Sequence, residues 1–72
     1  MEYENKFKDI LKELRQERHL GQVELAKQIG VSKGVISLWE NGLREPSMYC
    51  LIILAKFFNI SIDELVGFNQ NV

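Results

Sequence analysis

The chain has 72 residues, of which 46% are hydrophobic, with a net charge of −1 and an isoelectric point of about 5.8. This length allows one small domain, and an all-helical core is the most economical way to fold it. A single cysteine, Cys50, excludes an internal disulfide, and the lone His19 has no ligand cluster around it, so we expect no metal and no cofactor. The apolar run of residues 48–55 is too short to span a bilayer, and the acidic N-terminal segment is not a signal peptide, which together predict a cytoplasmic protein.

The first predicted helix begins at Phe7, after a mostly polar segment of six residues. Apolar side chains then recur at the i, i+3, i+4 and i+7 positions, which is the spacing of a helix that buries one stripe. We expect this helix to end near Arg18, because His19 occupies a turn position that would suit glycine.

Two short helices around one glycine turn form the centre of the chain, from Gln22 to Gly42. Gly30 permits the turn, since a residue just past a helix end commonly adopts a left-handed conformation. Ala26 is small where the two helices would cross steeply. The remaining inward positions are Leu25, Ile29, Val31, Ile36 and Trp39. This spacing predicts a helix-turn-helix.

The second helix of this pair should start at Lys33, after a Ser32 cap, and continue to about Asn41. Ser47 caps a fourth predicted helix, whose expected core positions are Met48, Leu51, Ile52, Ala55 and Phe58. A capping box at residues 61–64 opens a short fifth helix that stops at Gly67. We therefore expect one domain over residues 1–67 and a short C-terminal tail, residues 68–72.

Charge is unevenly distributed along these elements. The acids gather in the first 17 residues, whereas Lys33 and Arg44 flank the third predicted helix in a stretch poor in acids. A local basic face is thus compatible with a slightly acidic protein.

Residues in several parts of the chain match one known sequence pattern in a single register, without a gap. They are Gln22, Ala26, Gly30, Val31, Ile36, residues 39–42, Pro46, Ser47, Ser61 and residues 63–65. With this pattern, residues 7–67 resemble the phage-repressor and Cro type of helix-turn-helix, the XRE family. The resemblance implies an all-α fold, a compact five-helix bundle of the lambda-repressor-like type. It also implies a DNA-binding transcriptional regulator, commonly a dimer, whose third helix enters the major groove of double-stranded DNA.

Four positions of the third helix would face DNA: Lys33, Gly34, Ser37 and Leu38. Lys33 would donate to a guanine or hold a phosphate, and Ser37 would bond to a base or a phosphate. Leu38 and Val35 would contact thymine methyl groups. Gly34 departs from the family pattern, in which a side chain reads a base there, and it costs a helix about 1 kcal/mol relative to alanine. Three interpretations remain open for it: close approach to DNA, weak discrimination, or a position without a role.

The resemblance also implies phosphate contacts from Gln22, Asn41 and Arg44. For Arg44, an ordinary solvated surface charge is the alternative. Arg15 and Glu40 correspond to a structural ion pair that joins the first helix to the end of the third. Removing one partner of such a pair is costly when it is deeply buried.

The fourth predicted helix carries more apolar surface than one core needs. Tyr49, Ile53 and Phe57 form a second stripe, and Phe68 follows the fifth helix. We interpret these residues as a homodimer interface that spaces two third helices on a palindromic operator. The alternative is that the N-terminal segment, through Tyr3 or Phe7, folds back to cover them.

The leading hypothesis is a small dimeric repressor that competes with polymerase for a promoter, regulated by its own concentration or by another protein. The alternative is a protein-interaction module on the same fold, such as an antitoxin or adaptor, with weak DNA discrimination. An enzyme is not expected, because the sequence has no glycine-rich phosphate loop, no evident carboxylate pair and no histidine partner for Cys50. No small-molecule site or membrane contact is evident either.

Overall fold

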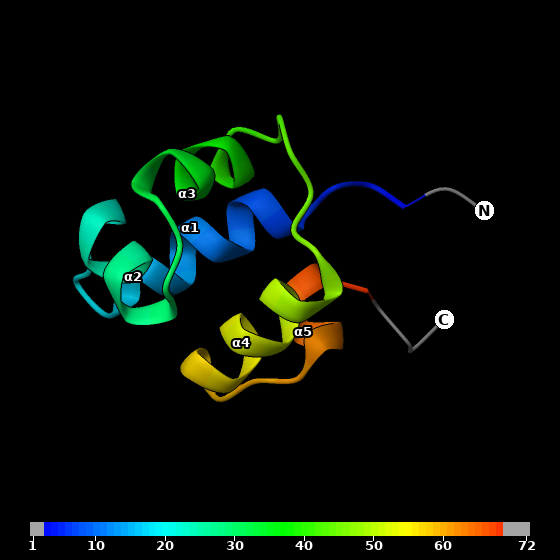
Figure 1. Ribbon diagram of the computed structural model, residues 1–72. Coiled ribbons are helices and arrows are strands. Elements are labelled where there is room, and N and C mark those ends of the chain that lie inside the picture. Colours follow the sequence, from blue (N-terminus) through cyan, green and yellow to red (C-terminus); the bar gives the residue numbers. More distant parts are fainter. Residues whose placement is uncertain (1–2, 69–72) are drawn as a thin grey trace.

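The computed structural model describes residues 3–68. In that range the regular secondary structure consists of helices joined by turns and loops, with no strand. The helices are α1 (Phe7–Glu17), α2 (Gln22–Ile29), α3 (Lys33–Glu40), α4 (Met48–Phe58) and α5 (Ile62–Val66). In Figure 1, α1 crosses the middle of the molecule between α3 on one side and α4 with α5 on the other. The predicted all-α five-helix fold is confirmed. Within the described part of the chain, no helix has the length and apolarity to cross a membrane.

Side-chain caps begin α3, α4 and α5 at the predicted serines. The Oγ atoms of Ser32, Ser47 and Ser61 each accept a hydrogen bond from the backbone N–H three residues further on. The Glu64 carboxylate in turn accepts from the backbone N–H of Ser61, which completes the predicted capping box. The third helix ends at Glu40, one residue before the predicted Asn41. Of the predicted tail, residues 69–72 lie outside the described residues.

Left-handed residues end the helices where tight turns follow. Gly30 has φ +77° between α2 and α3, and His19 has φ +56° after α1, in the turn where glycine would be more comfortable. Gly67 has φ +71°, and a Cβ atom added there would lie 2.8 Å from Cδ1 of Ile10. This position therefore needs glycine both for its backbone conformation and for the approach of α1.

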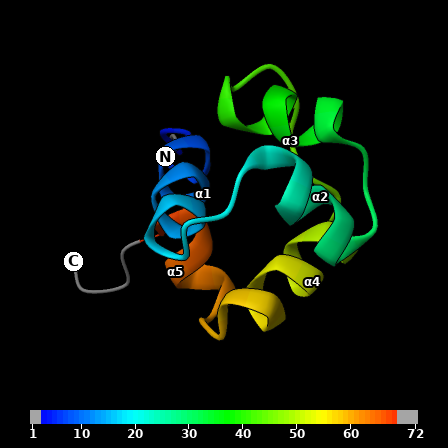
Figure 2. The ribbon, with the colours of Figure 1, turned by 90° about the vertical axis from the view of Figure 1, so that its left-hand side faces the viewer.

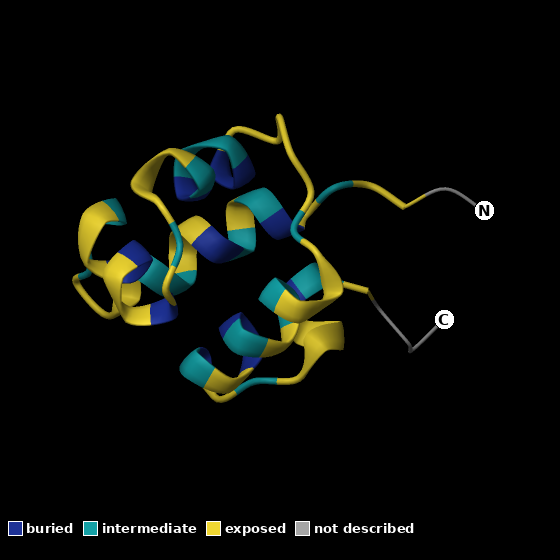
Figure 3. Cartoon of the chain, in the orientation of Figure 1, coloured by how far each residue is buried: buried dark blue, intermediate teal, exposed yellow. Residues whose placement is uncertain are grey.

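The core lies between α1 and the four other helices. Figure 3 shows buried residues on the inward sides of α1, α2, α3 and α4. Phe7 of α1 contacts Trp39 of α3 edge to face, with ring centroids 6.2 Å apart. The fully buried side chains of the core include Leu11, Leu25, Ile36, Leu54 and Leu65. Trp39 is thus a core residue, as the sequence pattern indicates.

The predicted core face of α4 is partly wrong. Met48 is 76% exposed and Ile52 is 38% exposed, whereas Leu54, which the pattern did not place in the core, is fully buried. Only Lys56 is charged in this helix, so its apolar residues do not mark one stripe. The buried face was decided by the packing of α4 on α2 and α5.

Candidate nucleic-acid interface

A buried ion pair joins α1 to the end of α3. Arg15 Nε donates to Glu40 Oε2 at 2.7 Å, and Arg15 Nη2 donates to Glu40 Oε1 at 2.9 Å. The Arg15 side chain is 11% exposed and that of Glu40 is 2% exposed. Hydrogen bonding to the Glu40 carboxylate raises the pKa of Arg15 above its usual value, so the guanidinium stays charged. The geometry is bidentate, which fixes direction as well as distance.

Two further hydrogen bonds extend this pair into a network. Arg15 Nη1 donates to the carbonyl oxygen of Leu20 at 2.9 Å, and Gln22 Nε2 donates to Glu40 Oε1 at 3.1 Å. We call these side chains of Arg15, Gln22 and Glu40 the interhelical brace. It connects α1, the turn after it, α2 and α3, so the position of α3 is fixed by polar contacts as well as by core packing.

Gln22 therefore has a contact that the sequence pattern did not indicate. The resemblance implies a phosphate contact, but its partner in the structure, Glu40, lies 18 residues away in the sequence. No local pattern signals such a pair. An amide nitrogen carries two hydrogens, so one N–H of Gln22 can still donate to another group.

The outer face of α3 presents a mixed set of side chains. Lys33 and Gly34 are exposed in its first turn, and Ser37 and Leu38 are half-buried. Val35 differs from the prediction, because it is half-buried and packs against the core. It lies one helical turn before Trp39, on the side of α3 that faces inward.

Gly34 is not required by the packing of the protein. Apart from the adjacent residues and the backbone of its own helix, a Cβ atom added there would meet only Ser32 Oγ, at 3.9 Å, among the described residues. The residue lies in regular helix, where alanine would be about 1 kcal/mol more favourable. The fold itself thus leaves this outward position free to carry any side chain.

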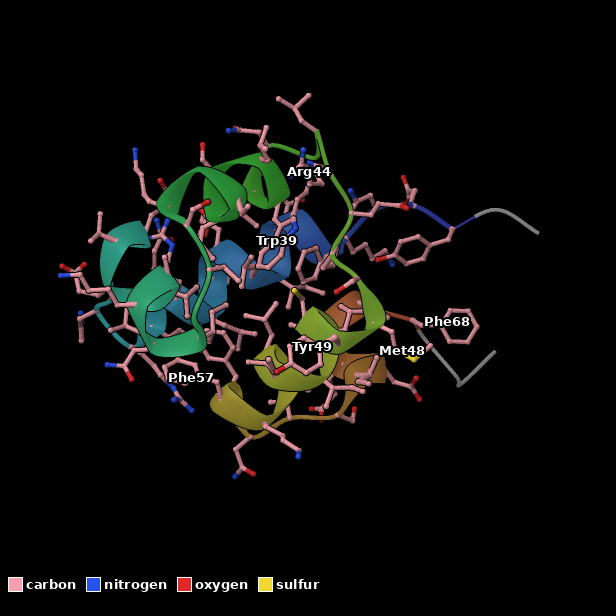
Figure 4. The ribbon with its side chains drawn as sticks, viewed as in Figure 1. Trp39, Arg44, Met48, Tyr49, Phe57 and Phe68 are labelled. Atoms are coloured by element: carbon pink, nitrogen blue, oxygen red, sulfur yellow. The ribbon has the colours of Figure 1, made fainter. Side chains whose placement is uncertain are left out.

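Two of the predicted phosphate-binding residues, Asn41 and Arg44, lie at or just after the C-terminal end of α3, and their surroundings differ from each other. Asn41 turns back on the helix, where its Nδ2 donates to the backbone oxygen of Ser37 at 2.9 Å and to Ser37 Oγ at 3.3 Å. Arg44 is exposed in the loop before α4 and forms no ion pair with any residue in the range 3–68. Figure 4 shows it on the side of the molecule away from α4 and α5.

A second surface of the molecule is apolar. We define the α4–α5 apolar surface by its exposed members: Met48, Tyr49, Ile52, Ile62 and Phe68. Tyr49 and Met48 are both more than 70% exposed, at 72% and 76%, and Phe68 is 42% exposed. Figure 4 labels Met48, Tyr49 and Phe68 on the half of the molecule formed by α4 and α5.

Two members of the predicted dimer stripe lie elsewhere. Ile53 and Phe57 are half-buried and pack against the core. The Arg18 guanidinium lies 5.2 Å from the centroid of the Phe57 ring and donates to the Phe57 carbonyl oxygen at 2.9 Å. Arg18, the residue that follows α1, therefore covers the C-terminal end of α4, and the exposed surface shifts toward the N-terminal end of this helix.

The described part of the N-terminal segment, residues 3–6, does not cover that surface. The Tyr3 hydroxyl donates to the backbone oxygen of Val66, and Phe7 is 4% exposed in the core. The segment thus lies against the end of α5, while Met48 and Tyr49 remain open to solvent. Two interpretations of this surface were a homodimer interface and an N-terminal segment that folds back over it. The second interpretation does not account for Met48 and Tyr49, because the described residues leave them exposed. Figure 2 gives a second view of α1, α4 and α5.

Comparison with known proteins places these features in a family. The Helix-turn-helix family model matches residues 11–65. BcrR, a transcriptional activator of Enterococcus faecalis, is 43% identical over 61 residues, which are 85% of this chain and 30% of BcrR. The phage repressor RstR of Vibrio cholerae is 40% identical over 61 residues, which are 85% of this chain and 55% of RstR. The chain thus spans about half or less of these relatives.

A solved structure of the P22 c2 repressor in complex with a synthetic operator has a similar fold. It superimposes with a TM-score of 0.81 and 28% identity over 96% of this chain and 100% of that chain. The matches confirm the resemblance to the phage-repressor type, and they show that the chain belongs to the helix-turn-helix family.

Proposed function

We propose that the chain is a sequence-specific DNA-binding regulator of transcription that acts as a repressor. The observation that carries the proposal is the outer face of α3, which is exposed at Lys33 and Gly34 while the interhelical brace fixes the helix from behind. A helix held in this way can enter a major groove with its first turn toward the bases. The likeness to a repressor solved with its operator supports the same placement.

Lys33 and the residues one turn further along α3 would read the base edges. The Lys33 ammonium would donate to O6 and N7 of a guanine, and Leu38 would contact a thymine methyl group. Ser37 is engaged by Asn41, so its hydroxyl would donate to a base acceptor while it accepts from that amide. Gly34 supplies no reading side chain, and we expect the weakest sequence preference opposite it.

Phosphate contacts would hold this helix in the groove. Arg44 is exposed and has no intramolecular ion pair among residues 3–68, so binding a phosphate breaks no ion pair within that range. The remaining N–H of Gln22 lies at the start of α2, where the helix dipole also favours an anion. These contacts give affinity that depends on salt but not on sequence.

The α4–α5 apolar surface would join two copies of the chain on a palindromic operator. Two-fold pairing would bury Met48 and Tyr49, which no part of the described chain covers, and would space two α3 helices about one turn of DNA apart. Tyr49→Glu places a charge in this contact, and we expect a monomer by analytical ultracentrifugation. The control is Lys56→Glu, on an exposed position of the same helix. A wild-type protein that is monomeric at high micromolar concentration would contradict the dimer and favour an interaction module that needs a foreign partner.

Repression would follow from occupancy. A dimer on an operator that overlaps a promoter excludes polymerase, so the protein acts by binding, without catalysis, in the cytoplasm where the chromosome lies. RstR and P22 c2 are named repressors and BcrR an activator, so the sign of regulation needs its own measurement. We expect a reporter placed after the selected site to lose expression when the protein is present.

The deciding experiment is selection of random duplex DNA by the purified protein, with sequencing of the survivors, at two salt concentrations. We expect a palindromic site whose half-sites are about one helical turn apart, with binding that weakens steeply as salt rises. Lys33→Ala should relax the preference at one base pair, whereas Arg44→Gln should weaken all sequences equally. Recovery of no motif together with weak binding at low salt would overturn the proposal.

A further inference from the structure

A lysine of α1 lies beside the C-terminal end of α3. Gly42 follows the Asn41 cap and has φ +72°, and a Cβ atom added to it would lie 3.0 Å from Cδ and 3.7 Å from Cε of Lys8. The stem of Lys8 therefore crosses the backbone of Gly42. Figures 1 and 2 both show the first turns of α1 close to the loop that follows α3.

The charge of Lys8 is only weakly neutralised. Its Nζ atom lies 3.5 Å from Oδ2 of Asp9, the residue next to it, and the two side chains are 39% and 74% exposed. A long, solvent-exposed pair of this kind contributes little and is easily exchanged for another anion. Lys8 forms no other ion pair within residues 3–68.

The same end of α3 requires cations if DNA is to approach it. The C-terminal end of a helix carries the negative pole of its dipole, which repels a phosphate. Arg44 supplies one cation from the loop, and the Asn41 amide donates back to its own helix. Lys8 adds a second positive charge at this end from a different helix.

We propose that Lys8 binds a DNA phosphate and forms, with Arg44, a two-cation clamp at the C-terminal end of α3. This inference rests on the proposed function, because it names a further contact of the same DNA interface. It also gives a role to the basic residue that α1, the helix before the helix-turn-helix, places against Gly42. The clamp would position the strand without reading its sequence.

The test is the salt dependence of DNA binding by the full chain. Each neutralised phosphate adds about 0.9 to the slope of log K against log salt concentration, so Lys8→Gln should reduce the magnitude of that slope by about 1. We expect the loss of affinity to be the same for the selected site and for random duplex DNA. Lys8→Arg keeps the charge and should retain the wild-type slope. Lys56→Gln removes the same charge from an exposed position in the last turn of α4 and should leave the slope unchanged.

A wild-type slope in Lys8→Gln, measured on a protein that itself binds with steep salt dependence, would overturn the clamp and leave the proposed function standing. A wild-type protein whose binding shows neither a motif nor salt dependence would overturn both. Lys8→Met keeps the stem across Gly42, so it gives the same measurement should Lys8→Gln unfold. A loss of slope in Lys8→Met, with its unfolding temperature unchanged, supports a phosphate contact and not a packing role.

Discussion

Different interactions stabilise the two halves of the molecule internally. In the half formed by α1, α2 and α3, polar side chains reach from one helix to another through the interhelical brace. In the half formed by α4 and α5, the side-chain hydrogen bonds of Ser47 and Ser61 stay within their own helices, and packing of apolar residues joins the helices.

This difference matches the work that we propose for each half. A helix that reads DNA must keep its direction to within a fraction of a turn, and a buried bidentate ion pair has one strongly preferred geometry. An apolar surface has weaker directional demands, and it can remain exposed until a second copy covers it. One half is thus expected to be sensitive to the loss of a charge, and the other to the loss of apolar volume.

The largest expected effect is the loss of the brace. Glu40→Ala leaves the Arg15 guanidinium, in a side chain only 11% exposed, without its carboxylate and removes the acceptor of Gln22. We expect the free energy of unfolding to fall by about 3–5 kcal/mol, measured by urea denaturation followed by circular dichroism. The control replaces both partners, as Arg15→Met with Glu40→Leu, and should cost far less because no charge is stranded. A single variant that lost less than about 1 kcal/mol would show that the brace does not hold this half together.

The next effect separates the two faces of α4. Leu54→Ala opens a cavity in the core and should cost about 2–5 kcal/mol. Met48→Ala, on the α4–α5 apolar surface of the same helix, should change the free energy of unfolding by less than about 0.5 kcal/mol. The comparison requires a concentration at which the protein is monomeric, because dimer formation would add to the stability. Equal losses in the two variants would mean that Met48 is as buried as Leu54.

The smallest effect concerns the local caps. Ser61→Ala removes one of the two hydrogen bonds of the capping box of α5, and we expect a loss of about 1 kcal/mol. Amide hydrogen exchange at Glu64 should accelerate at the same time, since its N–H loses its acceptor. Ser61→Asp keeps an acceptor and is the matched control. Unchanged exchange at Glu64 in Ser61→Ala would show that the cap contributes nothing to the second half.

Local chemistry made most of the helix boundaries predictable. Serine caps at Ser32, Ser47 and Ser61 and the turn residues Gly30 and Gly67 act within a few residues of themselves, so their effects are visible in the sequence. The ion pair between Arg15 and Glu40 could be predicted only through the resemblance to a family. The hydrogen bond from Gln22 to Glu40 could not be predicted from the sequence, because it joins residues of two helices that are 18 residues apart.

The sequence by itself determined that residues 3–68 form five helices, two of them the helix-turn-helix, because caps, turns and apolar spacing are local and agree with one another. Only the tertiary structure decided which face of α4 is buried, that Val35 turns inward, that Arg18 covers Phe57 and that Lys8 lies against Gly42. An almost wholly apolar helix such as α4 has no polar side to orient it. A lysine or arginine side chain can adopt many conformations and reach many partners. The arrangement of the neighbouring helices selects one orientation of α4 and one partner for each of these side chains.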